Sequence, residues 1–131
     1  MARNQDPVVK EESLGHVVKV QQVIDFMVLS ELLKGRRYAS EMEQWIIKSL
    51  DGVGVNDGYL SARLKKLAEN GHVKREWGDD NRYNRYYEIT DSGMVYFRAL
   101  LSDLPDRVKL AQKVYKLFDS YVGQFASIRS S

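Results

Sequence analysis

The chain has 131 residues, the length of a single domain or of one domain with a short extension. Hydrophobic residues make up 44% and charged residues 29% of the chain, which is typical of a globular protein and excludes a disordered or fibrous one. No apolar run reaches the roughly 18 residues of a membrane-spanning helix. Because cysteine is absent, disulfides and cysteine-based zinc sites are excluded. We therefore expect a cytoplasmic protein with no cofactor, metal or membrane partner.

The formal net charge is +2, which permits binding to nucleic acid without requiring it. The charges are unevenly distributed along the chain. Residues 1–33 carry 3 basic and 5 acidic side chains, residues 34–85 carry 11 and 8, and residues 86–131 carry 6 and 5. The positive excess therefore lies in the middle of the chain.

The N-terminal third of the chain is predicted to hold a flexible arm and one helix. Residues 1–15 are polar and lack a hydrophobic periodicity, which is typical of an arm. From His16 to Lys34 apolar residues cover most of a helical wheel, and Gly35 is suited to end the helix. A helix of this kind is buried on several sides or packs against a second subunit.

Two further helices are predicted in the middle of the chain. Ser40 and Glu43 have the spacing of a capping box, which indicates that a helix begins there. A loop containing glycines follows, and Asn56 or Asp57 is expected to cap a third helix that ends near Asn70. The apolar stripe of this third helix comprises Leu60, Leu64 and Leu67, with Ala68 at its edge.

After the third helix the apolar spacing changes from helical to alternating. This change predicts two β-strands over residues 72–77 and 85–89. The segment between them is rich in Gly, Asp and Asn, which favour turns. We therefore expect a β-hairpin with a charged tip.

Residues 91–122 carry apolar residues at alternating steps of four and three, a heptad-type pattern typical of a helix that pairs with a second subunit. Pro105 lies within this segment, which predicts either one kinked helix or two helices with Asp103 capping the second. Residues 123–131 are expected to form a frayed tail. The predicted dimer seam comprises Phe97, Leu101, Leu104, Val108, Ala111, Tyr115, Phe118 and Val122.

Three short helices followed by a two-stranded ribbon are the plan of a winged helix-turn-helix. The predicted fold class is mostly α with a two-stranded β-wing (α+β), in which residues 16–90 form the winged helix and residues 91–122 a dimerisation helix. In such modules the third helix enters the major groove of DNA, and the ribbon lies beside it. The outward face of the third helix is basic, which suits this role.

The candidate DNA contacts fall into three groups. The third helix contributes Tyr59, Ala62, Arg63, Lys65 and Lys66. The wing contributes Arg82 and Arg85, and the weaker phosphate contacts are Lys34, Arg36, Arg37, Lys74 and Arg75. Basic residues on a surface helix or a hairpin are often only a solvated face, and Asp79 and Asp80 reduce the positive field of the hairpin. The combination of helix, wing and basic middle segment favours DNA binding.

Other functional signals are weak. The glycine spacing around Gly52 and Gly54 does not match a dinucleotide or nucleotide loop, and no nucleophile is paired with a base, so we expect no enzymatic activity. His16 and His72 are interpreted as structural. Trp45 and the tryptophan at position 77 are interpreted as core or interface residues. A small-molecule effector is possible, but core packing explains both tryptophans equally well.

The middle of the chain, residues 29–93, resembles the PadR family of winged-helix transcriptional regulators. The matching pieces are LLKGRRYASEM from Leu32, GYLSARLKKLAENGHV from Gly58 and YYEITDSG from Tyr86. The resemblance implies a DNA-binding dimer joined through its C-terminal helix, often with help from the N-terminal helix. Family members usually carry a tyrosine where Ser61 stands, so the base contacts are expected to differ here. The pattern is also similar to a cyanobacterial circadian clock modifier of this group.

The sequence therefore predicts a homodimeric, sequence-specific regulator of transcription that binds double-stranded DNA at a near-palindromic site. A repressor, for example of a circadian clock gene, is the expected role, located in the cytoplasm at the bacterial nucleoid. One alternative is a DNA-organising protein for partition or termination. The other is a winged-helix protein-interaction module that does not bind DNA.

Overall fold

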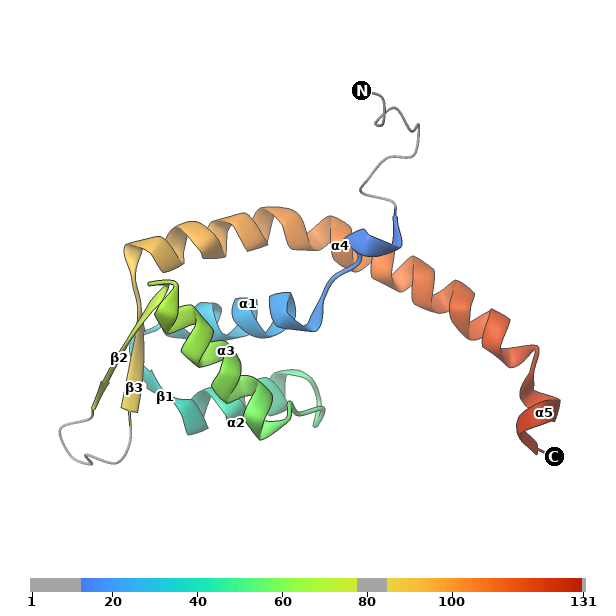
Figure 1. Ribbon diagram of the computed structural model, residues 1–131, viewed down its shortest axis with the longest axis horizontal. Coiled ribbons are helices and arrows are strands. Elements are labelled where there is room, and N and C mark those ends of the chain that lie inside the picture. Colours follow the sequence, from blue (N-terminus) through green and yellow to red (C-terminus); the bar gives the residue numbers. More distant parts are fainter. Residues whose placement is uncertain (1–12, 78–84, 131) are drawn as a thin grey trace, which may run out of the picture. The chain divides into compact units, whose positions relative to one another are not determined.

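The computed structural model describes residues 13–77 and 85–130 (Figure 1). The chain divides into two compact units. One comprises Val20–Ser102, and the other comprises the described residues that precede and follow it. Most of the predicted N-terminal arm and the tip of the hairpin, which includes Arg82, lie outside the described residues.

Three helices form the body of the first unit: α1 (Val20–Leu32), α2 (Ala39–Ser49) and α3 (Asp57–Glu69). All three were expected, but α1 begins four residues later than the sequence predicts. A short 3-10 helix, η3 (Leu14–His16), precedes it, and Val17 is extended. The β-branched pair Val17 and Val18 separates the two helices, which agrees with the preference of such residues for extended backbone.

The predicted N-cap of α2, Ser40, is wrong by two residues. Tyr38 is the N-cap, and its backbone N–H donates to Glu41 Oε1 at 2.7 Å, so Ser40 lies inside the helix and does not cap it. A carboxylate in the first turn satisfies a backbone donor that the helix leaves free. At the next helix the prediction is confirmed, because Asn56 Oδ1 accepts from the backbone N–H of Gly58 at 2.9 Å.

The core lies where α1, α2, α3 and the sheet meet. The predicted stripe of α3 is confirmed, since Leu60, Leu64 and Leu67 are all buried. Burying a large aliphatic side chain contributes about 1.5–3 kcal/mol, so this stripe alone holds α3 firmly to the body. The largest fully buried apolar side chains are Leu29, Met42, Ile46, Leu64, Leu67 and Val28.

Three antiparallel strands form one sheet: β1 (Arg37–Tyr38), β2 (Val73–Trp77) and β3 (Arg85–Ile89), in the order β1-β3-β2. The predicted hairpin of β2 and β3 is confirmed, with its pairing running from the Val73–Ile89 pair to the Trp77–Arg85 pair. The sequence did not predict β1. A strand of two residues is too short to carry an alternating pattern.

The chain continues into one long helix, α4 (Asp91–Gly123), which contains Pro105. The alternative of two helices is therefore wrong. Asp103 is not an N-cap, and its carboxylate accepts from Arg107 Nε within the same helix. The expectation of a frayed tail is also wrong for the described residues, because Ala126–Ser130 form a short helix, α5.

The turn after α3 is fastened to the beginning of α4. Thr90 Oγ1 donates to the carbonyl oxygen of Gly71 at 2.6 Å and accepts from the backbone N–H of Gly93 at 3.0 Å. The ring of His72 stacks on that of Tyr96, with centroids 4.7 Å apart. These contacts fix the end of the third helix and the wing to the same point.

We predict that Gly93→Ala destabilises the protein by about 1–3 kcal/mol, the usual range for an overpacked site. A Cβ at this position would lie 2.1 Å from the backbone oxygen of His72, and backbone cannot move aside as a flexible side chain would. Urea unfolding followed by circular dichroism measures the loss. Gly123→Ala is the matched control, because nothing lies within 4 Å of its added methyl group. Equal stability of the two variants would contradict the prediction.

Candidate nucleic-acid interface

The outward face of α3 is polar and open to solvent. Lys65 and Lys66 are exposed, and neither forms an ion pair with another described residue. Ala62 is exposed and small, and Tyr59 is partly buried against the core. The face also carries an acidic residue that the prediction overlooked, the exposed Glu69 in the last turn. Of the five residues predicted on α3, three are therefore exposed on this face and Tyr59 is partly exposed.

The fifth, Arg63, does not belong to this face. Its Nε and Nη2 donate to the two carboxylate oxygens of Asp25 at 2.9 and 2.7 Å, and only 15% of its side chain is exposed. Asp25 is fully buried in α1, and Tyr96 of α4 donates its hydroxyl hydrogen to Asp25 Oδ2 at 2.6 Å. A buried carboxylate needs such partners. Arg63 thus joins α3 to α1, and its assignment as a DNA contact is corrected.

The electrostatics of this network follow from its hydrogen bonds. Burial, followed by the hydrogen bond to Asp25, raises the pKa of the Tyr96 hydroxyl well above its ordinary value. The hydrogen bond to Asp25 also raises the pKa of Arg63. Tyr96 therefore stays neutral and Arg63 stays charged across the physiological pH range. The network holds one negative and one positive charge, so α3 is fixed to α1 without an uncompensated charge.

The basic segment before α2 is divided between structural and exposed roles. Arg37 Nε lies 3.1 Å from Glu31 Oε2 and its side chain is partly buried, so it is a structural residue rather than the predicted phosphate contact. The Lys34 ammonium lies 3.2 Å from Glu31 Oε1 and 4.6 Å from the centroid of the Trp45 ring, but its side chain is 58% exposed. Lys34 and the exposed Arg36 keep their charges at the surface.

The hairpin has two different faces, because successive residues of a strand point to opposite sides. Val73 and Tyr87 are buried in the core, so their face is turned toward the helices. Arg75 pairs with Tyr87 across the strands and shares this face, as does Arg85. Both arginines are exposed, and neither forms an ion pair with another described residue. The predicted wing contact Arg85 and the weaker predicted phosphate contact Arg75 therefore lie on the helix side of the hairpin.

Lys74 lies on the opposite face of the hairpin. Its ammonium is 3.6 Å from Glu76 Oε2, and Tyr86 donates its hydroxyl hydrogen to Glu76 Oε1 at 3.0 Å. This hydrogen bond raises the pKa of Tyr86. The guanidinium of Arg36 lies 4.1 Å from the centroid of the Tyr86 ring and covers it. Lys74 is therefore paired with Glu76 on this face, opposite to the face of Arg75 and Arg85.

The predicted seam of α4 is only partly exposed. Phe97 is buried and stacks on Phe26 of α1, with ring centroids 4.9 Å apart, so its assignment to a dimer interface is corrected. Ala111 is buried, and Leu104 is partly buried. The exposed members of the seam are Leu101, Val108, Tyr115, Phe118 and Val122. Toward the C-terminal end, further exposed apolar residues that the prediction omitted are Leu117, Tyr121, Phe125 and Ile128.

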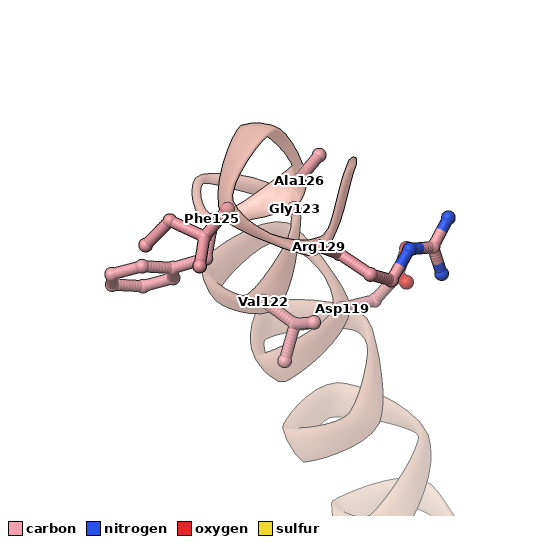
Figure 2. A pocket seen from close by; sticks show the side chains of 7 residues that line it. Asp119, Val122, Gly123, Phe125, Ala126 and Arg129 are labelled. Carbon is pink, nitrogen blue, oxygen red and sulfur yellow. The ribbon is translucent and has the colours of Figure 1, made fainter. Parts of the chain in front are cut away.

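A cavity lies where α4 meets α5, and Figure 2 shows the side chains that surround it. Apolar groups of Val122 and Phe125 line it together with Asp119 and Arg129. This cavity continues the exposed apolar surface at the C-terminal end of the chain. Among the described residues no helix is long and apolar enough to span a membrane.

A comparison with known proteins identifies the family of this chain. The Transcriptional regulator PadR-like family matches residues 28–99, which is more than half of the chain. No curated protein matches the chain. The family consists of transcriptional regulators rather than enzymes.

Solved structures share the winged-helix fold. A transcriptional regulator from Clostridium thermocellum is 22% identical with a TM-score of 0.55, over 81% of this chain and 95% of that one. The circadian clock associated protein Pex from Anabaena is 19% identical with a TM-score of 0.57, over 73% and 86%. A winged-helix DNA-binding protein from STIV is 18% identical with a TM-score of 0.52, over 65% and 88%. The chain belongs to the PadR-like family and is a DNA-binding transcriptional regulator with a winged-helix fold.

Proposed function

We propose that the protein is a homodimeric repressor that binds a specific site on double-stranded DNA. The observation that carries this proposal is the outward face of α3, on which Lys65 and Lys66 are exposed beside the small side chain of Ala62. A small residue lets the helix approach the groove closely, and lysines reach phosphate oxygens or guanine edges. Repression follows when the bound protein excludes RNA polymerase from the promoter. This mechanism requires no cofactor.

The remaining contacts surround this helix. We assign Tyr59, which lies in the first turn of α3 and is partly buried, to a contact with a base or a phosphate. Arg75 and Arg85 lie on the helix side of the wing, and we assign them to the backbone or the minor groove beside α3. Arg82, which lies outside the described residues, is assigned the same role. Lys34 and Arg36 supply phosphate contacts ahead of α2.

The exposed apolar surface of α4 supports dimer formation. A contiguous exposed apolar surface on a small protein marks an interaction site. We assign it to a second copy of the chain, so that two copies of α3 enter successive major grooves about one helical turn apart. A twofold axis then requires a near-palindromic DNA site, and the protein works in the cytoplasm at the nucleoid.

We predict that Phe118→Asp weakens the dimer by about two orders of magnitude or more, because an unpaired charge in a buried interface costs about 3–5 kcal/mol. Phe118 is 57% exposed in the single chain, so the change should leave its fold intact. Sedimentation velocity measures the dimer fraction, and circular dichroism checks the fold. Ser120→Asp, at an exposed polar position of α4, is the control. A wild-type sedimentation profile for Phe118→Asp would contradict the assignment of the seam.

Capture of sheared genomic DNA by the purified protein, followed by sequencing, tests the proposed function. At about 0.15 M salt most purely electrostatic binding is suppressed. Sharp peaks that share a palindrome are the expected result. Broad domains of enrichment would instead indicate a DNA-organising protein, and no enrichment would indicate a protein-interaction module. The identity of the genes beside the peaks then shows whether the target is a clock gene. The similarity to Pex is the reason to consider this class of target.

A further inference from the structure

Trp77, at the end of β2, has an exposed side chain. It is the largest exposed apolar side chain among the described residues of the winged-helix unit, Val20–Ser102. Its exposed fraction is 52%, so of the two expected roles, core or interface, the core role is wrong. Trp45, the other tryptophan, is partly buried on α2, and the Lys34 ammonium lies over its ring. Trp77 lies at the loop end of the wing, and a half-exposed tryptophan is a residue type enriched at binding interfaces.

The ring of Trp77 is occupied on one side by Arg85. The two residues are direct partners in the antiparallel pairing of β2 and β3. The guanidinium carbon of Arg85 lies 4.7 Å from the centroid of the ring, within the range of a cation–π interaction. A guanidinium stacked on an aromatic ring keeps its N–H donors free in its own plane, where they match the oxygens of a phosphate.

The strand pairing shows which face of the hairpin carries Trp77 and Arg85. Trp77 and Arg85 share the face of the hairpin that carries Arg75, which is the helix side. Both arginines on this face are exposed. On the other face the Glu76 carboxylate forms an ion pair with Lys74 and accepts a hydrogen bond from Tyr86. The surroundings of Trp77 therefore suit a polyanion better than an apolar protein partner.

We propose that Trp77 is a positioning residue for DNA binding: its ring holds the Arg85 guanidinium toward a phosphate of the duplex, and the bound duplex covers the ring. This inference rests on the proposed function and adds to it a residue that carries no charge. The preformed stack lowers the entropy that a free arginine side chain would lose on binding. The phosphate lies beside the groove that α3 occupies.

A double-mutant cycle tests the positioning role, with fluorescence anisotropy of a labelled mixed-sequence duplex as the readout. We expect Trp77→Ala and Arg85→Ala each to weaken binding by roughly threefold to tenfold. The double variant should bind no more weakly than Arg85→Ala, because the ring acts only through the arginine. Trp77→Phe, which keeps a ring, should restore most of the affinity. Additive losses in the double variant would overturn the positioning role.

A second measurement reports on the ring itself and does not depend on the cycle. In a Trp45→Phe background Trp77 is the sole tryptophan, since the chain contains two. Acrylamide should quench its fluorescence less when the duplex is bound. Unchanged quenching, at duplex concentrations where anisotropy reports full binding, would overturn this inference and leave the proposed function intact. Absence of any anisotropy change would overturn both.

Discussion

Asp25→Ala is expected to lower the free energy of unfolding by about 3–5 kcal/mol, the range observed when one partner of a buried ion pair is removed. Asp25 is fully buried and accepts hydrogen bonds from both Arg63 and Tyr96. Its loss leaves the Arg63 guanidinium with no counter-charge in a poorly hydrated site. Because most domains are stable by only about 5–15 kcal/mol, this change removes a large part of the total. Urea unfolding followed by circular dichroism measures it.

The controls separate loss of the charge pair from loss of packing. Asp106→Ala, at an exposed position of α4, should change stability by less than about 0.5 kcal/mol. Asp25→Leu combined with Arg63→Met should lose less than Asp25→Ala alone, because no charge is then left unpaired. Tyr96→Phe should cost about 1.5–3 kcal/mol, the net contribution of a hydrogen bond to a charged group. A loss below about 1 kcal/mol for Asp25→Ala would contradict the proposed importance of the network.

Lys65→Ala combined with Lys66→Ala is expected to weaken DNA binding by at least about tenfold, because a hydrogen bond to a charged group contributes about 1.5–3 kcal/mol. The salt dependence should change as well. Each lysine that contacts a phosphate contributes about one to the slope of log affinity against log salt concentration, so the variant should show a shallower slope. Both side chains are exposed, and the fold should not change. Anisotropy titrations at several salt concentrations measure affinity and slope together.

The matched control for this prediction removes the same charge elsewhere. Lys109→Ala combined with Lys113→Ala changes two exposed lysines of α4, outside the winged-helix unit. This variant should retain wild-type affinity to within about twofold and the wild-type salt slope. If the two double variants behave alike, net charge rather than the face of α3 explains the binding, and the assignment of the recognition helix is wrong.

The sequence correctly predicted the helices and strands whose hydrophobic pattern lies within the element itself. The stripe of Leu60, Leu64 and Leu67 has the period of a helix, and the structure buries all three. Alternation around Val73 predicted the hairpin for the same reason. Such patterns arise because one side of an element faces the core, so they appear in the order of the residues.

Residues whose role depends on a distant partner were predicted less well. Arg63 lies at the edge of the apolar stripe of α3, where its side chain can turn inward or outward. Its direction is decided by Asp25, which is 38 residues earlier in the chain. A signal was present in α1, because an aspartate among buried apolar positions needs a partner of opposite charge. Periodicity alone does not identify that partner.

The heptad pattern of α4 shows the same limit. Phe97 and Phe118 occupy equivalent steps of the pattern, yet Phe97 is buried in its own chain and Phe118 is exposed. A heptad position predicts that a side chain is covered. It does not predict whether the same chain or a second subunit covers it. Pro105 was ambiguous for a related reason, since proline removes one backbone donor and the surrounding residues decide whether the helix continues.

The central claim is that the outward face of α3 lies in the major groove, and a tethered cleavage reagent tests it most directly. The chain has no cysteine, so Ser61→Cys, at an exposed position on the flank of α3, creates a single thiol for an iron chelate. Gln112→Cys, exposed on α4, is the control position. After anisotropy confirms that both conjugates bind a captured site, the label at position 61 should cleave within each half-site, in the major groove. Cleavage only from position 112, or from neither position, would contradict the claim.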